Sequence, residues 1–425
     1  MAIIRPIFNW VAQPGVTPPA VSFTRGSTAT YTDALGVIRT AQAGVLRDSF
    51  DPLTGAYLGK LIEEQRTNLL LYSSVFDNAA WTQLNSPSIA AGAAVSPDGS
   101  QNAYSVGDTS TAQMRAIKQD LTVPANTSTY CASLYAQKTP GVSTITNFNL
   151  YFFNGTQADY RLDVNTATGE CRPNTTYPGA ASPAAYGVID CGLYWRLWVS
   201  GANKGDSTSL RFGLTPAYGL GWSQTQPDVS QTKTLVIWGA QLENGAFPTS
   251  YMPTTGDAFT RSADQCTLPL ASLVDTGGNP AFGMACGTMF ADFAFNGMRT
   301  DAVGQAVIGL DDGTAANRIN ISRTLASGLF AWDKVSGAQV GALQILHPSP
   351  AAGTRYRAAN GFDGTGRSSC LNGAGVLTDA TPIAPVATTL NIGSLANGSF
   401  LNGVVRHAAL FNRRLSDADL QALTA

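Results

Sequence analysis

The sequence predicts an all-β protein in which a small N-terminal module precedes two tandem β-sandwich, or jelly-roll, domains. Charged residues make up 13% of the 425 residues, about half of the roughly 25% found in an average soluble domain, so few Lys and Glu remain for salt-bridged helix faces. Glycine is abundant, at 43 residues, which favours many tight turns. Apolar residues, at 44%, suffice to build cores and argue against disorder.

Charge and targeting signals narrow the function classes. The formal net charge is −2 and no basic block occurs, which argues against nucleic acid or an anionic membrane surface as a partner. No run approaches the roughly 20 apolar residues of a membrane span, and the N-terminus lacks the apolar core of a signal peptide. We therefore expect no membrane insertion, no signal peptide and synthesis in a cytoplasm.

The cysteines are scattered without a CxxC pair, which is typical of reduced thiols rather than of a disulfide framework or a zinc site. They are Cys131, Cys171, Cys191, Cys266, Cys286 and Cys370. A disulfide between Cys171 and Cys191 stays open as an alternative if their strands are neighbours.

The first 22 residues are predicted to form an extended arm, because prolines exclude a helix and remove backbone donors. The prolines are Pro6, Pro14, Pro18 and Pro19, and the apolar side chains of the arm are Ile3, Ile4, Ile7, Phe8 and Trp10. An arm this apolar packs either on its own chain or on a partner, and both alternatives are open. In the next segment, 33–36 and 51–55 each lead from Asp to Gly, as tight turns do, and 37–40 and 45–48 are strand-like.

Residues 59–73, GKLIEEQRTNLLLYS, join this module to the next domain. Their charged residues stand directly before the apolar run Leu69 to Leu71. We expect the three leucines to be buried, and Glu63 and Arg66 to form structural hydrogen bonds.

The residue order from Arg25-Gly-Ser-Thr-Ala-Thr-Tyr, through Asp33 and Arg47-Asp48, to the Arg-Thr-Asn-Leu-Leu segment resembles a module that recurs in tailed-bacteriophage virion proteins. The resemblance covers roughly residues 23–81. It implies a virion protein whose residues 1–75 dock on other virion proteins, and a homotrimer, since phage appendages are usually trimers. The docking or structural residues would be Trp10, Arg25, Glu63, Arg66 and Asn68.

Residues 76–256 are predicted to form the first sandwich, because several segments alternate apolar with polar residues at the spacing of a sandwich. Its closing phrase, from Trp238-Gly-Ala-Gln-Leu-Glu to Tyr251-x-Pro, resembles the last strand of carbohydrate-binding-module-like sandwiches in phage tail proteins. That resemblance argues for the fold more strongly than for sugar binding.

Residues 257–425 are predicted to form the second sandwich. Asn372-Gly373 and Asn397-Gly398 are hairpin signals. The chain ends with a strand over 403–410 and a short helix capped by Ser416. This ending resembles laminin-G-like, concanavalin-type jelly rolls.

Catalytic patterns are sparse. The two histidines, His347 and His407, are expected to be structural, and no GxSxG, HExxH or P-loop signature occurs. Paired carboxylates for glycan hydrolysis remain an alternative. The candidates are Asp159, Asp163, Glu243, Asp292, Asp311, Asp312 and Asp333. We favour a turn for Asp311-Asp312-Gly313, and we expect no enzymatic activity.

Ligand-facing groups are expected among the aromatics, which stack on sugar faces and anchor interfaces. The Gly-rich segment from Tyr218 to Trp222 is the best candidate, with Tyr177, Tyr186 and Trp332 weaker. No cofactor is expected, although calcium held by Asp311 and Asp312 is an alternative to a plain turn.

The favoured hypothesis is a non-enzymatic bacteriophage tail-fibre or baseplate receptor-binding protein, located in the virion, that contacts a host-surface glycan or another receptor through its sandwiches. A capsid decoration or head-fibre protein is the first alternative, and a carboxylate-based glycan depolymerase is the second. Deleting residues 1–75 is expected to leave both sandwiches folded but to abolish incorporation into particles.

Overall fold

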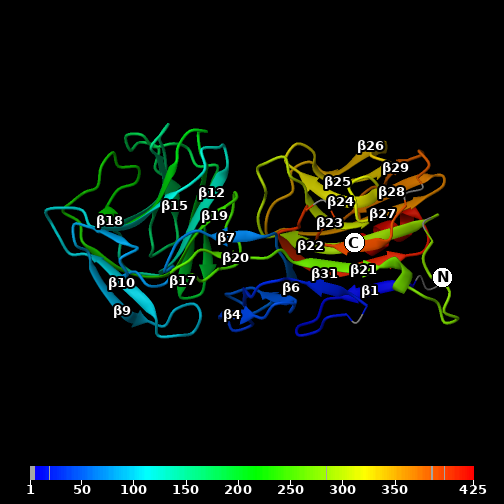
Figure 1. Cartoon of the computed structure of the whole chain (residues 1–425), viewed down its shortest axis with the longest axis horizontal. Helices are drawn as coiled ribbons and strands as arrows, with labels where there is room; N and C mark the ends of the chain where they lie inside the picture. The colour runs from blue at the N-terminus through cyan, green and yellow to red at the C-terminus, as the bar shows by residue number, and fades with distance from the viewer. Residues whose placement is uncertain (1–4, 19, 284, 384–385, 397) are drawn as a thin grey trace.

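A computed structural model describes residues 5–18, 20–283, 285–383, 386–396 and 398–425. The predicted all-β class is confirmed, because nearly all of the regular structure is strand. Two β-sandwiches lie side by side along the long axis of the molecule (Figure 1). We call them the middle sandwich and the C-terminal sandwich.

The middle sandwich consists of two six-stranded antiparallel sheets. One sheet has the order β16 (Ala185–Cys191), β17 (Tyr194–Ala202), β12 (Thr129–Gln137), β19 (Lys233–Asn244), β10 (Ala103–Asp108) and β9 (Ser88–Ala94). The other has the order β15 (Cys171–Pro173), β14 (Ala158–Val164), β13 (Ile145–Phe153), β18 (Ser209–Gly219), β11 (Ala116–Thr122) and β8 (Thr82–Leu84).

The alternation within β13 shows how these sheets are specified. Phe148, Leu150 and Phe152 are fully buried in the core between the sheets. The residues between them, Asn149 and Tyr151, are half-exposed on the outer face. Because successive side chains of a strand point to opposite faces, one face builds the core and the other stays open to solvent.

The C-terminal sandwich consists of an eight-stranded and a seven-stranded sheet. The first contains β29 (Leu377–Asp379), β28 (Gly366–Leu371), β27 (Arg355–Asp363), β22 (Gly287–Phe295), β31 (Gly403–Phe411), β6 (Tyr57–Ile62) and β5 (Arg47–Phe50), with β1 (Phe8–Val11) also paired to β31. The second contains β2 (Ser22–Thr24), β21 (Gln265–Pro269), β30 (Thr389–Ile392), β23 (Gln305–Asp311), β24 (Arg318–Thr324), β25 (Gly328–Val335) and β26 (Ala338–His347).

The N-terminal strands are therefore part of the C-terminal sandwich rather than a separate module. Figure 1 shows β1 and β6 beside β31, at the opposite end of the chain. Phe8, Trp10 and Ile62 are buried in the same core as Phe293 and Leu310. The apolar arm thus packs on its own chain, which was one of its two open alternatives.

The middle sandwich is inserted into the C-terminal sandwich. Two short strands, β7 (Arg66–Asn68) and β20 (Phe259–Arg261), pair antiparallel. The first leads from the C-terminal sandwich into the middle sandwich, and the second leads back. A second two-stranded sheet, β3 (Ala29–Thr32) and β4 (Ile38–Ala41), lies beside the insertion, where Ile38 N donates to Pro97 O (2.8 Å). Beyond β7, Leu70 is fully buried in the middle core, while Leu69 and Leu71 are only half-buried.

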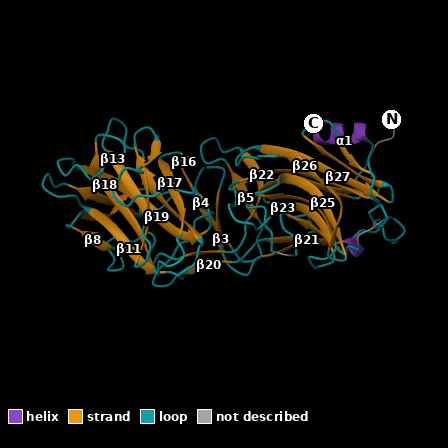
Figure 2. Ribbon diagram, turned by 90° about the horizontal axis from the view of Figure 1, so that it is seen from above, coloured by secondary structure: helices purple, strands orange, loops and turns teal. Residues whose placement is uncertain are grey.

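The chain ends as predicted, in a strand and a short helix. Helix α1 (Asp417–Thr424) begins after Ser416, whose hydroxyl accepts a hydrogen bond from Asp419 N. Leu420 packs with Phe290 and Phe411 against the outer face of the eight-stranded sheet (Figure 2). A 3-10 turn, η1 (Leu270–Ser272), is also present. Among the described residues, no helix has the length and apolar character needed to cross a membrane.

Several local expectations can also be compared with the structure. All six cysteines are free, so Cys171 and Cys191 form no disulfide. Asn372 and Gly373 both have positive φ, at 49° and 68°, as a tight hairpin turn requires. In the other predicted hairpin signal, Asn397 lies outside the described residues.

We predict that the two sandwiches differ in their dependence on the N-terminus. A fragment of residues 66–256 should unfold cooperatively on heating, because it contains the whole core of the middle sandwich. Deletion of residues 1–62 should abolish folding of the C-terminal sandwich, because it removes strands from both of its sheets. Circular dichroism on heating measures both outcomes. A deletion protein that retained the unfolding transition of the C-terminal sandwich would contradict this assignment.

Candidate functional site

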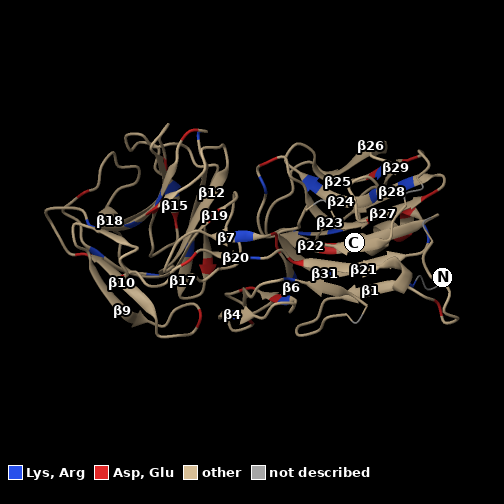
Figure 3. Cartoon of the chain, viewed as in Figure 1, with Lys and Arg blue, Asp and Glu red and all other residues tan. Residues whose placement is uncertain are grey.

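A buried ion cluster lies beside the paired connecting strands β7 and β20, and Figure 3 shows basic and acidic residues together around β7. We define the cluster as Arg25, Arg47, Glu63, Arg261 and Asp264. Arg25 Nη1 lies 3.0 Å from Asp264 Oδ1, both side chains being fully buried. Arg47 pairs with both carboxylates, at 2.8 Å from Glu63 Oε2. The cluster thus joins segments that lie up to 239 positions apart in the sequence.

Glu63 is the carboxylate that links the cluster to the end of the middle sandwich. Ser250 donates its backbone N–H (2.8 Å) and its hydroxyl (2.7 Å) to this side chain. Burial by itself would raise the pKa of Glu63, but Arg261 and Arg47 lower that pKa to about 2. Glu63 is therefore an anionic structural group, as expected from its position before β7.

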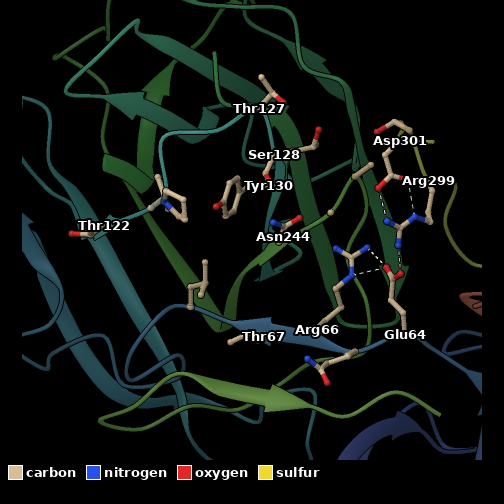
Figure 4. A pocket seen from close by; sticks show the side chains of 18 residues that line it. Glu64, Arg66, Thr67, Thr122, Thr127, Ser128, Tyr130, Asn244, Arg299 and Asp301 are labelled. Atoms are coloured by element: carbon tan, nitrogen blue, oxygen red, sulfur yellow. Dashed lines mark hydrogen bonds and ion pairs between the residues drawn. The ribbon is translucent and has the colours of Figure 1, made fainter. Parts of the chain in front are cut away.

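Arg66 and Asn68 fix β7 in a similar way. Asn68 is fully buried and donates to the carbonyls of Ala240 (3.1 Å) and Met252 (2.8 Å). Arg66 Nε donates to Glu64 Oε1 (2.7 Å), and the other oxygen of Glu64 pairs with Arg299. Figure 4 shows Glu64 between the two guanidinium groups.

The residues expected to dock the protein are thus internal. Trp10 is 3% exposed, and Arg25, Glu63, Arg66 and Asn68 are all buried within the chain. The structural hydrogen bonds predicted for Glu63 and Arg66 are present, whereas Trp10 Nε1 has no partner among the described residues. Because none of the five presents its side chain to solvent, a docking surface would have to use neighbouring residues.

We predict that Glu63→Gln destabilises the protein by about 3–5 kcal/mol, because it leaves buried arginines without their carboxylate. The pKa of Glu63 is lowered from its ordinary value of 4.5 to about 2. Its stabilisation is therefore complete above pH 4.5 and is lost as the pH falls toward 2. The free energy of unfolding of Glu63→Gln should therefore not show this decrease between pH 4.5 and pH 2.

Chemical denaturation of both proteins between neutral and acidic pH measures this difference. Glu170→Gln is the matched control, since Glu170 pairs with Arg172 at the surface and such pairs contribute about 0–1 kcal/mol. Equal losses in the two variants would refute a special role for the buried cluster.

The middle sandwich carries an open groove of about 380 Å³ on the outer face of the sheet that contains β13, β14, β18 and β11. Two rows of side chains cross this face in register. One row runs through Arg161, Asn149, Gly213 and Lys118, and the other through Asp159, Tyr151, Arg211 and Asp120. Because cross-strand neighbours on one face stand close together, each row presents a continuous strip of polar groups.

Ion pairs hold the groups of the groove in place. Arg211 binds Asp120 through two nitrogens, at 2.6 and 2.9 Å. Asp159 accepts from Arg161 Nε (2.7 Å) and from Asn149 Nδ2 (2.9 Å). A Cβ atom at position 213 would lie 2.2 Å from the Asn149 side-chain oxygen, so the glycine leaves room for this amide on the floor of the groove.

Aromatic rings complete the groove and its surroundings. Tyr151 stacks on Phe153, with ring centroids 5.5 Å apart and planes at 25°, and Arg211 lies over both rings. Tyr177 forms a side wall, with the Arg161 guanidinium 3.5 Å from its ring centroid. These rings are half-exposed and therefore offer apolar faces to a ligand.

The predicted ligand residues are placed differently. Tyr218 is fully buried, and burial raises its pKa to about 12. The expectation that its side chain faces a ligand is therefore wrong. Trp222 is half-exposed with Arg172 over its ring (4.6 Å), and its role stays a prediction. Of the weaker candidates, only Tyr177 lines the groove.

The candidate carboxylates have structural partners. Asp333 is fully buried against Arg367, and burial raises its pKa to about 7. Glu243 is equally buried and accepts from Gln241 and Thr249. Asp292 pairs with Arg355 and Arg357, Asp163 accepts from Asn147, and Asp159 lies in the groove.

The segment proposed for calcium forms a turn. Asp311 accepts from Gly313 N (3.0 Å) and Ala396 N (3.1 Å), and Asp312 accepts from Thr314 N (2.9 Å). In the part of the chain that the structure describes, no group of three or more His, Cys, Asp and Glu residues is placed to hold a metal.

Both histidines lie in structural settings. His407 Nε2 lies 2.6 Å from Asn9 Oδ1, and burial lowers the pKa of His407. His347 is at the end of β26, where its Nδ1 accepts from Ser349 N (3.1 Å).

Fold and groove together define an all-β protein of two sandwiches, one inserted into the other, with a polar and aromatic groove on the inserted one. No family model matches the sequence, and no curated protein matches it either. Among solved structures, the CBM40 module of a Ruminococcus gnavus IT-sialidase is 14% identical, with a TM-score of 0.28, over 34% of this chain and 84% of that one. A Trypanosoma rangeli sialidase is 12% identical, with a TM-score of 0.30, over 76% of this chain and 60% of that one.

A NanB sialidase from Streptococcus pneumoniae also overlaps with this chain, at 15% identity and a TM-score of 0.27, over 37% of this chain and 26% of that one. Similarities this low assign neither a ligand nor an activity. The β-sandwich class rests on the strands and sheets described above.

Proposed function

We propose that this chain is a non-enzymatic protein that binds carbohydrate through the groove of the middle sandwich. The observation that carries the proposal is the pair of polar rows beside Tyr151 and Tyr177 on an open sheet face. Sugars offer hydroxyl groups at close spacing and apolar ring faces. Amide, carboxylate and guanidinium groups can bind the hydroxyls, and tyrosine rings can stack on the faces.

The fixed geometry of the groove supports this proposal. Ion pairs already hold Arg211, Asp120, Arg161 and Asp159 in position, so a ligand would order few side chains on binding. Preorganisation of this kind lowers the entropic cost of binding. The groove volume of about 380 Å³ lies within the range of small-molecule sites, which suits one or two sugar residues.

We further propose that the protein belongs to a bacteriophage particle, as a homotrimeric tail-fibre or baseplate receptor-binding protein whose ligand is a host-surface glycan. The resemblance of residues 23–81 to virion modules supports this location. A capsid decoration or head-fibre role is the alternative, and antibody labelling of particles in the electron microscope distinguishes tail from head. A glycan depolymerase is the second alternative, but the buried partners of Glu243 and Asp333 speak against it.

Docking on other virion proteins would use the exposed turns of the N-terminal segment. The turns at 33–36 and 51–55 touch, since a Cβ at Gly36 would lie 2.5 Å from Pro52 O. Leu35 is 82% exposed and Leu53 is 62% exposed. Two large apolar side chains on adjacent turns form an apolar tip that a virion partner would cover.

We predict that Tyr151→Ala weakens binding to host-surface polysaccharide at least about tenfold, which corresponds to about 1.4 kcal/mol. The loss is expected because the variant removes the stacking ring and leaves the core intact, since Tyr151 is half-exposed. A glycan array followed by titration of the selected polysaccharide measures the change.

Tyr186→Ala serves as the matched control, because Tyr186 is 41% exposed and lies on the other sheet of the middle sandwich. If both variants bound like the wild type, the groove would not be the glycan site. Shortened polysaccharide chains after incubation with the wild type would instead favour the depolymerase.

We predict that Leu35→Asp combined with Leu53→Asp reduces incorporation into particles to background, because two charges would replace the apolar tip. Immunoblots of purified particles measure incorporation, and the unfolding temperature should stay at that of the wild type. The control is Leu193→Asp, since Leu193 is 70% exposed on the middle sandwich. Normal incorporation of the double variant would exclude the tip as the docking contact.

A further inference from the structure

A second cavity, of about 620 Å³, lies between the two sandwiches and is separate from the groove. We call it the inter-sandwich cleft. Its lining comes from β7, from the loop between β11 and β12, from the end of β19, and from residues 299–301 of the C-terminal sandwich. Figure 4 shows these side chains on opposite sides of the cleft. A ligand here would contact both sandwiches at once.

The charges of the cleft are already balanced. Glu64 pairs with both Arg66 and Arg299, and Arg299 also pairs with Asp301. Two cations therefore face two anions in one chain of ion pairs. An anionic ligand would meet two carboxylates, and each guanidinium is already in an ion pair, so the charge pattern favours an uncharged ligand.

One buried donor of the cleft has no partner. Arg66 is 6% exposed, and its Nη1 makes no hydrogen bond to any described residue. Gly245 adjoins this nitrogen so closely that a Cβ there would lie 1.3 Å from it. An unsatisfied buried donor costs roughly 1–3 kcal/mol, so a small shift of the Arg66 side chain toward an acceptor in the cleft would be stabilising.

Further polar groups surround this donor. The hydroxyl of Tyr130, the side-chain amide of Asn244 and the hydroxyl of Ser128 line the cleft. Asn244 is exposed and Ser128 is half-exposed, so both side chains can meet a ligand in the cleft. They supply both donors and acceptors, which is the combination that a polyol can satisfy.

We propose that the inter-sandwich cleft is a second binding site, for a neutral sugar unit. Balanced charges argue against a preference for acidic sugars, and the polar groups of the lining match hydroxyls. The volume suits a ligand of one to a few sugar residues. Contact with both β7 and residues 299–301 would make binding at this site sensitive to how the two sandwiches are held together.

The test uses the full chain carrying Tyr151→Ala, so that sugar binding in the groove does not contribute to the measured signal. Thr127→Trp should then fill the cleft, because Thr127 is exposed and lines it. Ala125→Trp is the control, since Ala125 is exposed on the same loop but does not line the cleft. The probes are D-galactose, N-acetyl-D-glucosamine and L-rhamnose, with N-acetylneuraminic acid as the anionic comparison.

Saturation-transfer NMR is expected to show contact with at least one neutral sugar for Tyr151→Ala and for its Ala125→Trp derivative. The signal should be lost with Thr127→Trp, and the anionic sugar should give none. No neutral-sugar signal for Tyr151→Ala, or equal signals for both Trp derivatives, would overturn the second site. If Tyr151→Ala bound neutral sugars as strongly as the wild type, and only its Thr127→Trp derivative lost binding, the groove would be overturned as a site and the cleft would remain. A stronger signal from the anionic sugar would overturn the ligand class.

Discussion

The architecture depends on carboxylates that are buried among arginines where the chain crosses between its two sandwiches. Glu63 precedes the first connecting strand and Asp264 follows the second, and Arg25 and Arg47 come from the N-terminal segment. Each charge is removed from water, a cost that only close and complete pairing offsets. Such a cluster forms only when all of its segments are in place, so it couples the start of the chain to the return from the middle sandwich.

Because one sandwich is inserted into the other, the part that joins the two ends of the chain and the part that carries the groove are different sandwiches. The N-terminal strands complete the sheets of the C-terminal sandwich, while the middle sandwich keeps its own core. Its outer sheet face can therefore vary in side chains without disturbing the strands that enclose the core. The rows through Tyr151 and Asn149 use this freedom, because every second residue of β13 is exempt from core packing.

Local patterns were sufficient for much of the fold. Alternation in β13 and the serine cap of α1 are readable from neighbouring residues, and the structure confirms both. The insertion was not readable, because the pairing of β1 with β31 joins residues about 400 positions apart and no local signal specifies it. Tyr218 was misassigned for a related reason: a Gly-rich segment suggests a loop, but β18 extends to Gly219 and buries the ring. Alternation along a strand is enough to identify outward residues such as Arg211. The rows that these residues form could not be predicted, because they depend on which strands are neighbours in the sheet.

The low charge content takes on a physical meaning in this arrangement. Many of the charged residues are buried in ion pairs that hold segments together, among them Arg367 with Asp333 and Lys60 with Asp48. Charges that are neutralised in internal ion pairs contribute little to long-range attraction of a partner. Recognition must then rest on short-range contacts, which are hydrogen bonds from fixed polar groups and stacking on exposed rings. Neutral, hydroxyl-rich surfaces are recognised by such contacts, and the groove and the cleft each present them, the cleft with its charges fully balanced.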